Sequence, residues 1–321
     1  MTYAIQAEGL VKNFGETKAL AGVDLETQVG TVLGVLGPNG AGKTTATRIL
    51  ATLLQPDGGR AAVAGHDVTR EAHRVRQLIG LTGQYAAVDE KLTGTENLTM
   101  LGRLLGLSGR DAKHRAAELL EQFGLSDAAG RKTKGYSGGM RRRLDLAASL
   151  VGRPSVLFLD EPTTGLDPHS RGELWGTVRS LVAGGTTVLL TTQYLDEADQ
   201  LADDIAVIDH GQVIANGTPE ELKTKIGGQV LEVRPAHEPD LDAVAGVVAE
   251  LTSERPDSSD GAVTAPVADP SVLTEVVRRL DDVSIAVGEL ALRRPSLNEV
   301  FLSLTGHRAE EPTNENVGST A

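Results

Sequence analysis

The fold is decided by one stretch of sequence, Gly37-Pro38-Asn39-Gly40-Ala41-Gly42-Lys43-Thr44-Thr45. It matches the pattern Gly-x-x-x-x-Gly-Lys-Thr, and it lies between an apolar run at 31–36 and a helical pattern over 43–54. Glycines let successive backbone N–H groups turn toward phosphate oxygens, and the N-terminus of a helix attracts the same negative charge. The context predicts a phosphate-binding loop; the alternative is a glycine-rich turn that fits the pattern by accident.

A second stretch, Ser155-Val-Leu-Phe-Leu-Asp160-Glu161-Pro162, places two carboxylates after four apolar residues. Folds of this kind bind ligands at the carboxyl ends of parallel strands, so we expect Asp160 and the Thr44 hydroxyl to ligate Mg²⁺. Lys43 would reach the β- and γ-phosphates, and Glu161 would act as the general base on the attacking water. Alone, such an acidic pair is more often a solvated strand end.

The pattern of the remaining chain up to about residue 227 predicts an α/β layer with a mainly parallel sheet. Apolar runs at 155–160, 186–190 and 204–209 predict buried strands, separated by helical stretches at about 168–183 and 196–203. Residues 93–129 have a helical pattern with breaks at Gly106 and Gly109. His210-Gly211, between two apolar runs, predicts a hairpin turn.

The C-terminal part of the chain predicts a small α+β unit, with strands at 230–234, 262–267 and 283–290 and helices at 240–251, 271–280 and 296–304. Residues 1–228 carry 24 Lys+Arg against 27 Asp+Glu, a net of −3, and residues 229–321 carry 7 against 17, a net of −10. This change indicates domains at 1–227 and 228–306, followed by a disordered tail at 307–321. The acidic second part argues against broad nucleic-acid binding.

Composition excludes two further classes of protein. The chain has no cysteine, which excludes a disulfide framework and a cysteine-based zinc site and fits a reducing cytoplasm. Its apolar runs are far shorter than the roughly 18 residues that a membrane span needs, and its N-terminus does not look like a signal peptide. If the protein serves a membrane, another chain must span it.

The stretch Tyr136-Ser137-Gly138-Gly139-Met140 lies between the phosphate loop and the Asp-Glu strand. Ser-Gly-Gly is a common helix start, in which a hydroxyl, free N–H groups and the helix dipole face outward. The stretch also resembles the signature of ABC ATPases, normally Leu-Ser-Gly-Gly-Gln, at the place in the chain that the family requires. The resemblance implies a head-to-tail dimer, in which Ser137, Gly138 and Gly139 of one subunit meet the γ-phosphate held by the other.

Smaller elements follow the family's order over about residues 3–226. By resemblance, Phe14 stacks on adenine, Gln84 ligates Mg²⁺ and senses the permease, and Asp167 in Thr164-Gly-Leu-Asp167 lies in the loop that crosses the dimer interface. An isolated aromatic such as Phe14 would more often belong to a core. The resemblance implies a P-loop NTPase fold with a RecA-like parallel sheet core, an antiparallel β subdomain and a helical subdomain.

Gln193 stands where ABC ATPases usually have a histidine that contacts the γ-phosphate and positions the water. Glutamine can donate a hydrogen bond but cannot exchange protons near pH 7. The surrounding string, Leu190-Thr-Thr-Gln193-Tyr-Leu-Asp-Glu, resembles drug-export ATPases of the daunorubicin-resistance type, in which glutamine is usual. Arg293-Arg-Pro-Ser-Leu-Asn-Glu-Val-Phe resembles the same branch. Gln193 is therefore interpreted as a family variant that acts with Glu161 and Lys43.

The sequence is interpreted as the ATPase subunit of a transporter, with ATP and Mg²⁺ as cofactors. The resemblance implies a homodimer on the cytoplasmic face of a membrane, beside a separate integral-membrane permease that exports a drug or antibiotic-like hydrophobic compound. The C-terminal domain would assist assembly or coupling, or be a packing appendage. One alternative is a soluble ABC ATPase acting on ribosomes or DNA, although the chain has one cassette and no coiled-coil insertion. The other, suggested by Gln193, is a switch that binds ATP and barely hydrolyses it.

Overall fold

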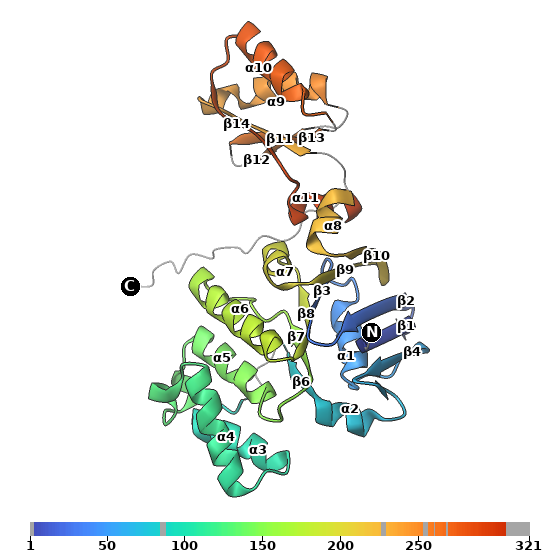
Figure 1. Cartoon of the computed structure of the whole chain (residues 1–321), viewed down its shortest axis with the longest axis vertical. Helices are drawn as coiled ribbons and strands as arrows, with labels where there is room; N and C mark the ends of the chain where they lie inside the picture. The colour runs from blue at the N-terminus through green and yellow to red at the C-terminus, as the bar shows by residue number, and fades with distance from the viewer. Residues whose placement is uncertain are drawn as a thin grey trace. The chain divides into compact units, whose positions relative to one another are not determined.

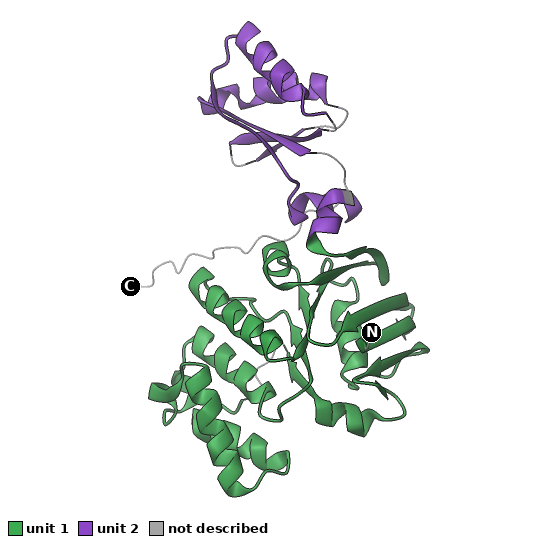
Figure 2. Ribbon diagram, viewed as in Figure 1, with its two compact units in different colours: residues 1–219, 309–321 green, residues 220–308 purple. Residues whose placement is uncertain are grey.

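The computed structural model describes residues 3–83, 88–225, 229–252, 256–259, 261–267 and 269–305. The chain forms two compact units, the first ending at Pro219 and the second beginning at Glu220 (Figure 2). The expected boundary at Gly227-Gly228, the expected magnesium ligand Gln84 and the expected tail at 307–321 lie outside the described residues. Each unit has its own hydrophobic core and is described by itself.

A six-stranded sheet forms the centre of the first unit, in the order β10-β9-β3-β8-β7-β6 (Figure 1). Five of these strands run parallel, and β10 pairs antiparallel with β9. Every residue of β3, β7 and β8 is buried, as expected for parallel strands covered on both faces. The predicted parallel sheet is confirmed. Its strands are β3 (Val32–Leu36), β6 (Ile79–Thr82), β7 (Val156–Asp160), β8 (Thr187–Thr192), β9 (Asp204–Asp209) and β10 (Gln212–Gly217).

Helices surround this sheet, and two of them, α3 and α4, form the helical region predicted over residues 93–129. In that region α3 and α4 pack as a pair beside α5, and Leu98, Leu119 and Leu157 belong to the core cluster that joins them to the sheet. The Thr93 side chain begins α3 by accepting from the Glu96 amide, while the Glu96 carboxylate accepts from the Thr93 amide. The helices are α1 (Lys43–Leu50), α2 (Ala72–Leu78), α3 (Gly94–Leu104), α4 (Gly109–Gln122), α5 (Gly138–Ser149), α6 (Pro168–Ala183) and α7 (Leu195–Leu201), with 3-10 turns at Ser126–Ala128 and Thr133–Gly135.

An antiparallel sheet completes the first unit, in the order β2-β1-β4-β5. Its strands are β1 (Tyr3–Phe14), β2 (Thr17–Gln28), β4 (Gly58–Val63) and β5 (His66–Asp67). Leu10, Leu20 and Val23 of this sheet are fully buried in the cluster that also contains Ile49 of α1. The antiparallel sheet therefore braces the helix that follows the phosphate loop.

Helix α1 is shorter than the sequence pattern predicts. It ends at Leu50 instead of residue 54, because Ala51 is its C-cap and Thr52 takes a left-handed conformation at φ 62°. Gly109 was expected to break the helical region, and it is instead the first residue of α4. The predicted hairpin is confirmed: His210 and Gly211 both have positive φ, at 45° and 74°, as a tight two-residue turn requires.

The second unit is an α+β layer, as predicted. Its antiparallel sheet has the order β12-β13-β11-β14, and its core cluster includes Leu231, Val263, Val248 and Leu280. Strand β14 begins at residue 287 and not at 283, because α10 runs to residue 282 and a turn with positive φ at Ser284 follows it. The elements are α8 (Pro219–Lys225), β11 (Gln229–Pro235), a 3-10 turn (Glu238–Asp240), α9 (Leu241–Leu251), β12 (Asp257–Ser259), β13 (Ala262–Val267), α10 (Val272–Asp282), β14 (Val287–Arg293) and α11 (Leu297–Thr305).

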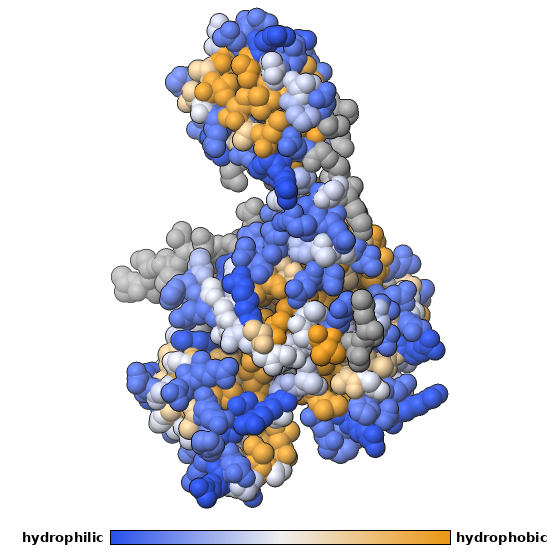
Figure 3. Space-filling model, in the orientation of Figure 1, coloured by the Kyte–Doolittle hydropathy of each residue, from blue (hydrophilic) through white to orange (hydrophobic). Residues whose placement is uncertain are grey.

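Apolar side chains gather on the face of the second unit that carries α9 and α10 (Figure 3). Val277 of α10 and Val283, just after this helix, are exposed, whereas Val276 and Leu280 of the same helix are buried. Helix α10 is amphipathic, and Val277 is an apolar side chain on an outer side that also carries the exposed Arg278 and Arg279.

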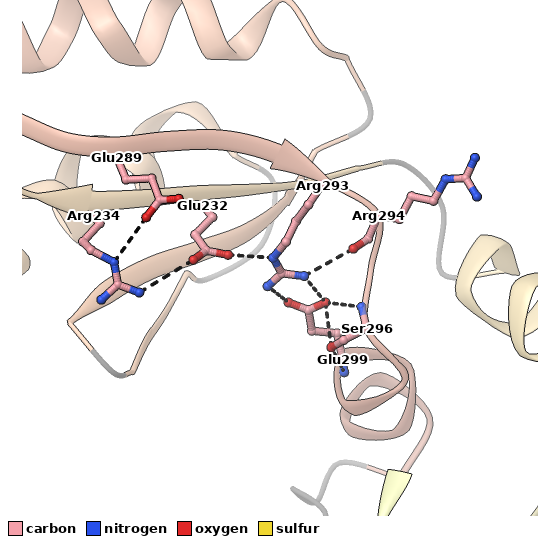
Figure 4. Close-up of polar contacts among 7 residues, drawn as sticks. All are labelled: Glu232, Arg234, Glu289, Arg293, Arg294, Ser296 and Glu299. Carbon is pink, nitrogen blue, oxygen red and sulfur yellow. Dashed lines mark hydrogen bonds and ion pairs between the residues drawn. The ribbon is translucent and has the colours of Figure 1, made fainter. Parts of the chain in front are cut away.

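A charged network ties α11 to the sheet of the second unit (Figure 4). Arg293, at the end of β14, donates to Glu232 of β11 at 2.6 Å and to both carboxylate oxygens of Glu299 at 2.7 and 3.0 Å. Glu299 also accepts from the Ser296 amide, and the Ser296 hydroxyl accepts from the Glu299 amide. Burial alone would raise the pKa of Glu299, but Arg293 and the Ser296 amide together hold that pKa below its usual value. The stretch from Arg293 to Glu299 is thus a joint between strand and helix.

We expect Glu299→Ala to destabilise the second unit by about 1–3 kcal/mol. The substitution removes both a helix cap and the bidentate hydrogen-bond partner of the half-buried Arg293 guanidinium. Hydrogen exchange of the full chain, followed by mass spectrometry of peptides covering β14 and α11, measures this loss. Arg294→Ala is the matched control, because Arg294 is 82% exposed and its partner Glu220 is 63% exposed. It should change the same free energy by less than about 0.5 kcal/mol. Equal effects of the two substitutions would contradict the stabilising role given to the contacts of Glu299 with Arg293 and Ser296.

Candidate functional site

Lys43 is the first residue of α1, and its side chain is almost fully buried beneath the loop before it. Its ammonium donates to the carbonyl oxygens of Gly37 at 2.6 Å and Pro38 at 3.1 Å. The same nitrogen lies 4.0 Å from Glu161 Oε1. Lysine presents three donors on a compact cation, so Lys43 organises the loop from within while placing positive charge where phosphate oxygens would bind.

The loop over residues 37–45 needs glycine for steric reasons. Gly42, the N-cap of α1, has φ 113°, and a β-carbon there would lie 2.6 Å from the Ala19 carbonyl oxygen of β2. Gly40 also has a positive φ, at 83°. No side chain caps α1 at Gly42, so the N–H groups at the start of the helix receive no side-chain hydrogen bond there. This close backbone course fits the phosphates of a nucleotide, which such loops bind through main-chain N–H groups.

Asp160 ends β7 and is buried between two hydroxyl groups. Thr44 Oγ1, from the second residue of α1, donates to Asp160 Oδ1 at 3.2 Å, and Thr191 Oγ1 of β8 donates to the same oxygen at 2.5 Å. A hydroxyl and a carboxylate at this spacing are the oxygen ligands that Mg²⁺ prefers. The donor set therefore fits the predicted metal, with Thr44 and Asp160 as the residues that would hold it.

Glu161 follows Asp160 in a left-handed backbone conformation, with φ 49°. Its amide donates to the Thr191 carbonyl oxygen at 3.0 Å and lies 3.2 Å from the Thr191 hydroxyl. Left-handed φ is unusual for a residue with a side chain and costs roughly 1 kcal/mol or more. The conformation turns the chain out of the sheet directly after Asp160, so that the Glu161 carboxylate comes to Lys43.

Gln193 comes directly after β8, the strand that neighbours both β3 and β7. Within the described part of the chain, its side-chain oxygen Oε1 is buried and has no hydrogen-bond partner. The next residue, Tyr194, stacks against Arg171 of α6, whose guanidinium carbon lies 5.5 Å from the ring centroid. Gln193 is thus at the same sheet edge as Asp160 and Glu161.

The signature stretch begins α5 and lies close to the start of α6. Ser137 is the N-cap of α5 and accepts from the Met140 amide, while Asp167 is the N-cap of α6 and accepts from the Ser170 amide and hydroxyl. A β-carbon on Gly139 would lie 2.9 Å from the Ser170 hydroxyl. The Ser170 hydroxyl, followed by its amide, lowers the pKa of Asp167. Two helix N-termini are therefore held side by side.

Phe14 lies away from this cluster, at the end of β1 in the antiparallel sheet. Its side chain is 51% exposed, and the Lys12 ammonium lies 5.8 Å from its ring centroid. Exposure leaves the ring open to stacking, which agrees with a binding role better than with a core role. Among the predicted residues, the side chains of Lys43, Thr44, Asp160 and Glu161 meet one another within 4.0 Å, with Thr44 at Asp160 and Lys43 at Glu161.

Comparisons with known proteins bear directly on this site. A family model described as "ABC transporter" matches residues 20–164, and one described as "ATP-binding protein DrrA1-3-like, C-terminal domain" matches residues 217–305. Over 311 residues the chain is 60% identical to the daunorubicin resistance ATP-binding protein DrrA2 of Streptomyces coeruleorubidus, an alignment that covers 96% of this chain and 97% of the relative. This chain belongs to that family of ABC ATP-binding proteins.

Solved structures of ABC ATP-binding cassettes share the fold of the first unit. One is a cassette in its ADP conformation, with 30% identity, a TM-score of 0.62, and coverage of 69% of this chain and 93% of that one. Another is a dimeric cassette in a post-hydrolysis state bound to ADP and phosphate, with 25% identity, a TM-score of 0.61, and coverage of 67% and 98%. The predictions of an ABC fold and of ATPase activity are confirmed.

ABC ATP-binding subunits such as this one bind ATP and pair with membrane permeases. None of the helices in the described ranges combines the length and the apolar character needed to cross a bilayer. The roles given above to individual residues of this ABC subunit stay predictions.

Two residues of the site carry no signal in the sequence. Thr191 bonds both Asp160 and Glu161 across a strand pairing that joins positions 31 residues apart. Arg142, on α5, reaches the main chain after β7 over a separation of 20 residues. Both contacts depend on the sheet order and on the docking of α5, which no local pattern specifies.

Glu197 is a third buried polar group near the site of this ABC subunit. It lies on α7, is fully buried, and accepts from Trp175 Nε1 of α6 at 3.2 Å. Burial raises the pKa of Glu197, and the hydroxyls of Thr192 and Thr163, Trp175 and the charge of Arg142 oppose this rise without cancelling it. The charged form of Glu197 is therefore disfavoured in the folded protein.

This raised pKa predicts a pH-dependent stability. Below the ordinary glutamate pKa of 4.5 the carboxyl is protonated in both states. As the pH rises above that value, the unfolded chain releases the proton first, so the unfolding free energy falls by up to about 1.4 kcal/mol per pH unit until the folded pKa is reached. In Glu197→Gln this slope should disappear, as measured by urea unfolding between pH 4.5 and 8. Glu173→Gln, at a half-exposed position on α6, should keep it. An unchanged slope in Glu197→Gln would contradict the prediction.

Proposed function

We propose that this chain hydrolyses Mg²⁺-bound ATP at the edge of its parallel sheet and thereby powers a separate membrane permease. The observation that carries the residue assignment is the meeting of Lys43, Thr44, Asp160 and Glu161, which come from α1 and from the end of β7. These four side chains supply a cation, a hydroxyl and two carboxylates, the groups that phosphoryl transfer to water uses.

In this mechanism the loop over residues 37–45 holds the phosphates through its amides and Lys43. Thr44 and Asp160 would hold Mg²⁺, which would supply positive charge to the phosphate oxygens when bound. Glu161 accepts a proton from the attacking water, whose position Gln193 fixes by a hydrogen bond. Because glutamine does not titrate near pH 7, proton acceptance falls to Glu161 alone.

Two copies of the chain would act together. Ser137 and Gly139 of one copy would face the γ-phosphate bound by the other, with Asp167 at the interface and Phe14 stacked on adenine. The proximity of Gly139 to Ser170 supports this, because it groups the starts of α5 and α6 into one surface. A solved cassette of the same fold is dimeric and bound to ADP and phosphate, which supports a homodimer here.

The proposed place of work is the cytoplasmic face of a membrane, with export as the direction. The relative from Streptomyces coeruleorubidus is named as a daunorubicin resistance protein, which favours a drug or antibiotic-like hydrophobic compound as cargo. We propose residues 1–227 as the ATPase domain and 228–306 as an accessory domain for assembly or coupling. The acidic charge of the second part argues against a nucleic-acid partner.

Glu161→Gln tests the chemistry. It should lower the rate of phosphate release by about 10²-fold or more, because it removes the general base while keeping the shape of the side chain. ATP affinity should stay within about twofold, as measured by equilibrium binding. Turnover that persists in Glu161→Gln would contradict the role of Glu161.

The same phosphate-release assay addresses a second candidate function, a nucleotide switch that binds ATP and barely turns it over. The buried Oε1 of Gln193, which has no hydrogen-bond partner in the described part of the chain, favours it, since no neighbour holds this oxygen. Wild-type turnover below one cycle per hour with tight ATP binding would support the switch.

The permease is tested by purifying tagged Glu161→Gln protein from detergent-solubilised native membranes with Mg²⁺ and ATP. We expect a stoichiometric membrane protein with several spanning helices, identified by mass spectrometry, because ATP held without hydrolysis keeps the assembly closed. Lys43→Ala under the same conditions is the control and should recover less of it. Ribosomes or nucleic acid in place of a membrane protein would favour the soluble alternative.

A further inference from the structure

Arg142 lies on α5, five residues after Ser137, and its side chain is only 13% exposed. Its guanidinium points at main-chain carbonyl oxygens at the ends of two neighbouring strands. Nη1 donates to Gly83, just after β6, at 2.8 Å. Nε donates to Pro162, just after β7, at 2.6 Å. Nη2 donates to Glu161 at 3.0 Å, with the Asp160 oxygen at 3.4 Å.

These carbonyl groups lie at the ends of β6 and β7, where strand pairing stops. Each therefore needs a hydrogen-bond donor from outside the sheet. Only a planar guanidinium offers donors in several fixed directions at once. One side chain therefore sets the ends of β6 and β7 relative to each other and relative to α5.

The bond from Arg142 to the Glu161 carbonyl has a particular consequence. Glu161 has a left-handed φ of 49°, which a residue with a side chain adopts only when its surroundings enforce it. Its amide is fixed by Thr191 of β8 at 3.0 Å, and its carbonyl by Arg142. The two contacts clamp the residue from both sides.

The charge of Arg142 is balanced from several elements. Asp145, one helical turn along α5, lies 3.6 Å from Nη1. Glu197 of α7 and Asp160 of β7 also act on it through space, against the desolvation that comes with burial. The guanidinium thus lies beside the Asp145 carboxylate of its own helix while it holds the main chain.

We propose that Arg142 is a positioning residue for hydrolysis, which keeps the Glu161 backbone in its left-handed conformation and so aims the carboxylate at the attacking water. This inference rests on the proposed role of Glu161 as general base. It also links α5, which begins with the signature residues, directly to the residue after β7, so that a displacement of α5 moves Glu161.

The test compares Arg142→Met and Arg142→Lys with the wild-type full chain in steady-state phosphate release with Mg²⁺ and ATP. Arg142→Met should lower kcat by about 10- to 100-fold, the scale of a displacement of about 1 Å, while KM for ATP stays within about twofold. Arg142→Lys keeps the charge but has one nitrogen for several carbonyl oxygens. Its kcat should therefore lie between those of Arg142→Met and the wild type. This variant also covers the case in which Arg142→Met does not fold.

Arg115→Met is the matched control. Arg115 of α4 is 18% exposed, lies 3.2 Å from Glu118, and donates to the Leu150 carbonyl oxygen at 2.8 Å, so it also fixes main chain with a mostly buried guanidinium. It should lower the melting temperature and leave kcat per folded molecule within about twofold. Equal kcat in Arg142→Met and Arg115→Met, wild-type kcat in Arg142→Lys, or a rise in KM at constant kcat would each overturn the proposal.

Glu161→Gln in the same assay separates this inference from the proposed function. If Glu161→Gln abolishes turnover and Arg142→Met does not reduce it, the function stands and the positioning role falls. If Glu161→Gln turns over normally, the role of Glu161 falls and the inference falls with it.

Discussion

The site depends on one buried carboxylate and the two hydroxyls that donate to it. Asp160 receives Thr44 from α1 and Thr191 from β8, and it stands opposite Thr191 in the parallel register of β7 and β8. A buried carboxylate is tolerated only when it is hydrogen-bonded, so these contacts fix where α1 starts relative to two strands. The loop over residues 37–45, the proposed magnesium ligands and the proposed base all take their positions from these contacts.

A second constraint comes from glycine and from left-handed backbone. Gly42 lets the loop pass against β2 at a distance that a β-carbon would forbid, and Glu161 turns the chain out of the sheet with φ 49°. The backbone at Gly42 is unstrained because glycine has no side chain. The backbone at Glu161 is strained, and Thr191 and Arg142 hold it in place. Strain retained beside reactive groups indicates that their positions matter more than local stability.

The parts of the site that are local in sequence could be predicted from it. The loop over residues 37–45 directly follows β3, and Asp160 and Glu161 come at the end of β7, so the local pattern was sufficient to place both stretches. Thr191 and Arg142 were not predicted, because their contacts depend on strand order and helix docking. The end of α1 was also missed, since a left-handed Thr52 stops the helix where the pattern continues. The stretch from Arg293 was noticed as a resemblance, and only the structure gives its physical role as a joint.

The glutamine at position 193 can be understood from the same geometry. An amide cannot take the proton of the attacking water, so the proposed mechanism depends more on Glu161 than it would with a histidine at position 193. A single base must then be held accurately, because no neighbouring group can compensate for its displacement. The clamp that Thr191 and Arg142 form around the Glu161 backbone meets this need. In the proposed mechanism, the absence of a titrating group at position 193 and the tight control of the Glu161 backbone are thus two aspects of one arrangement.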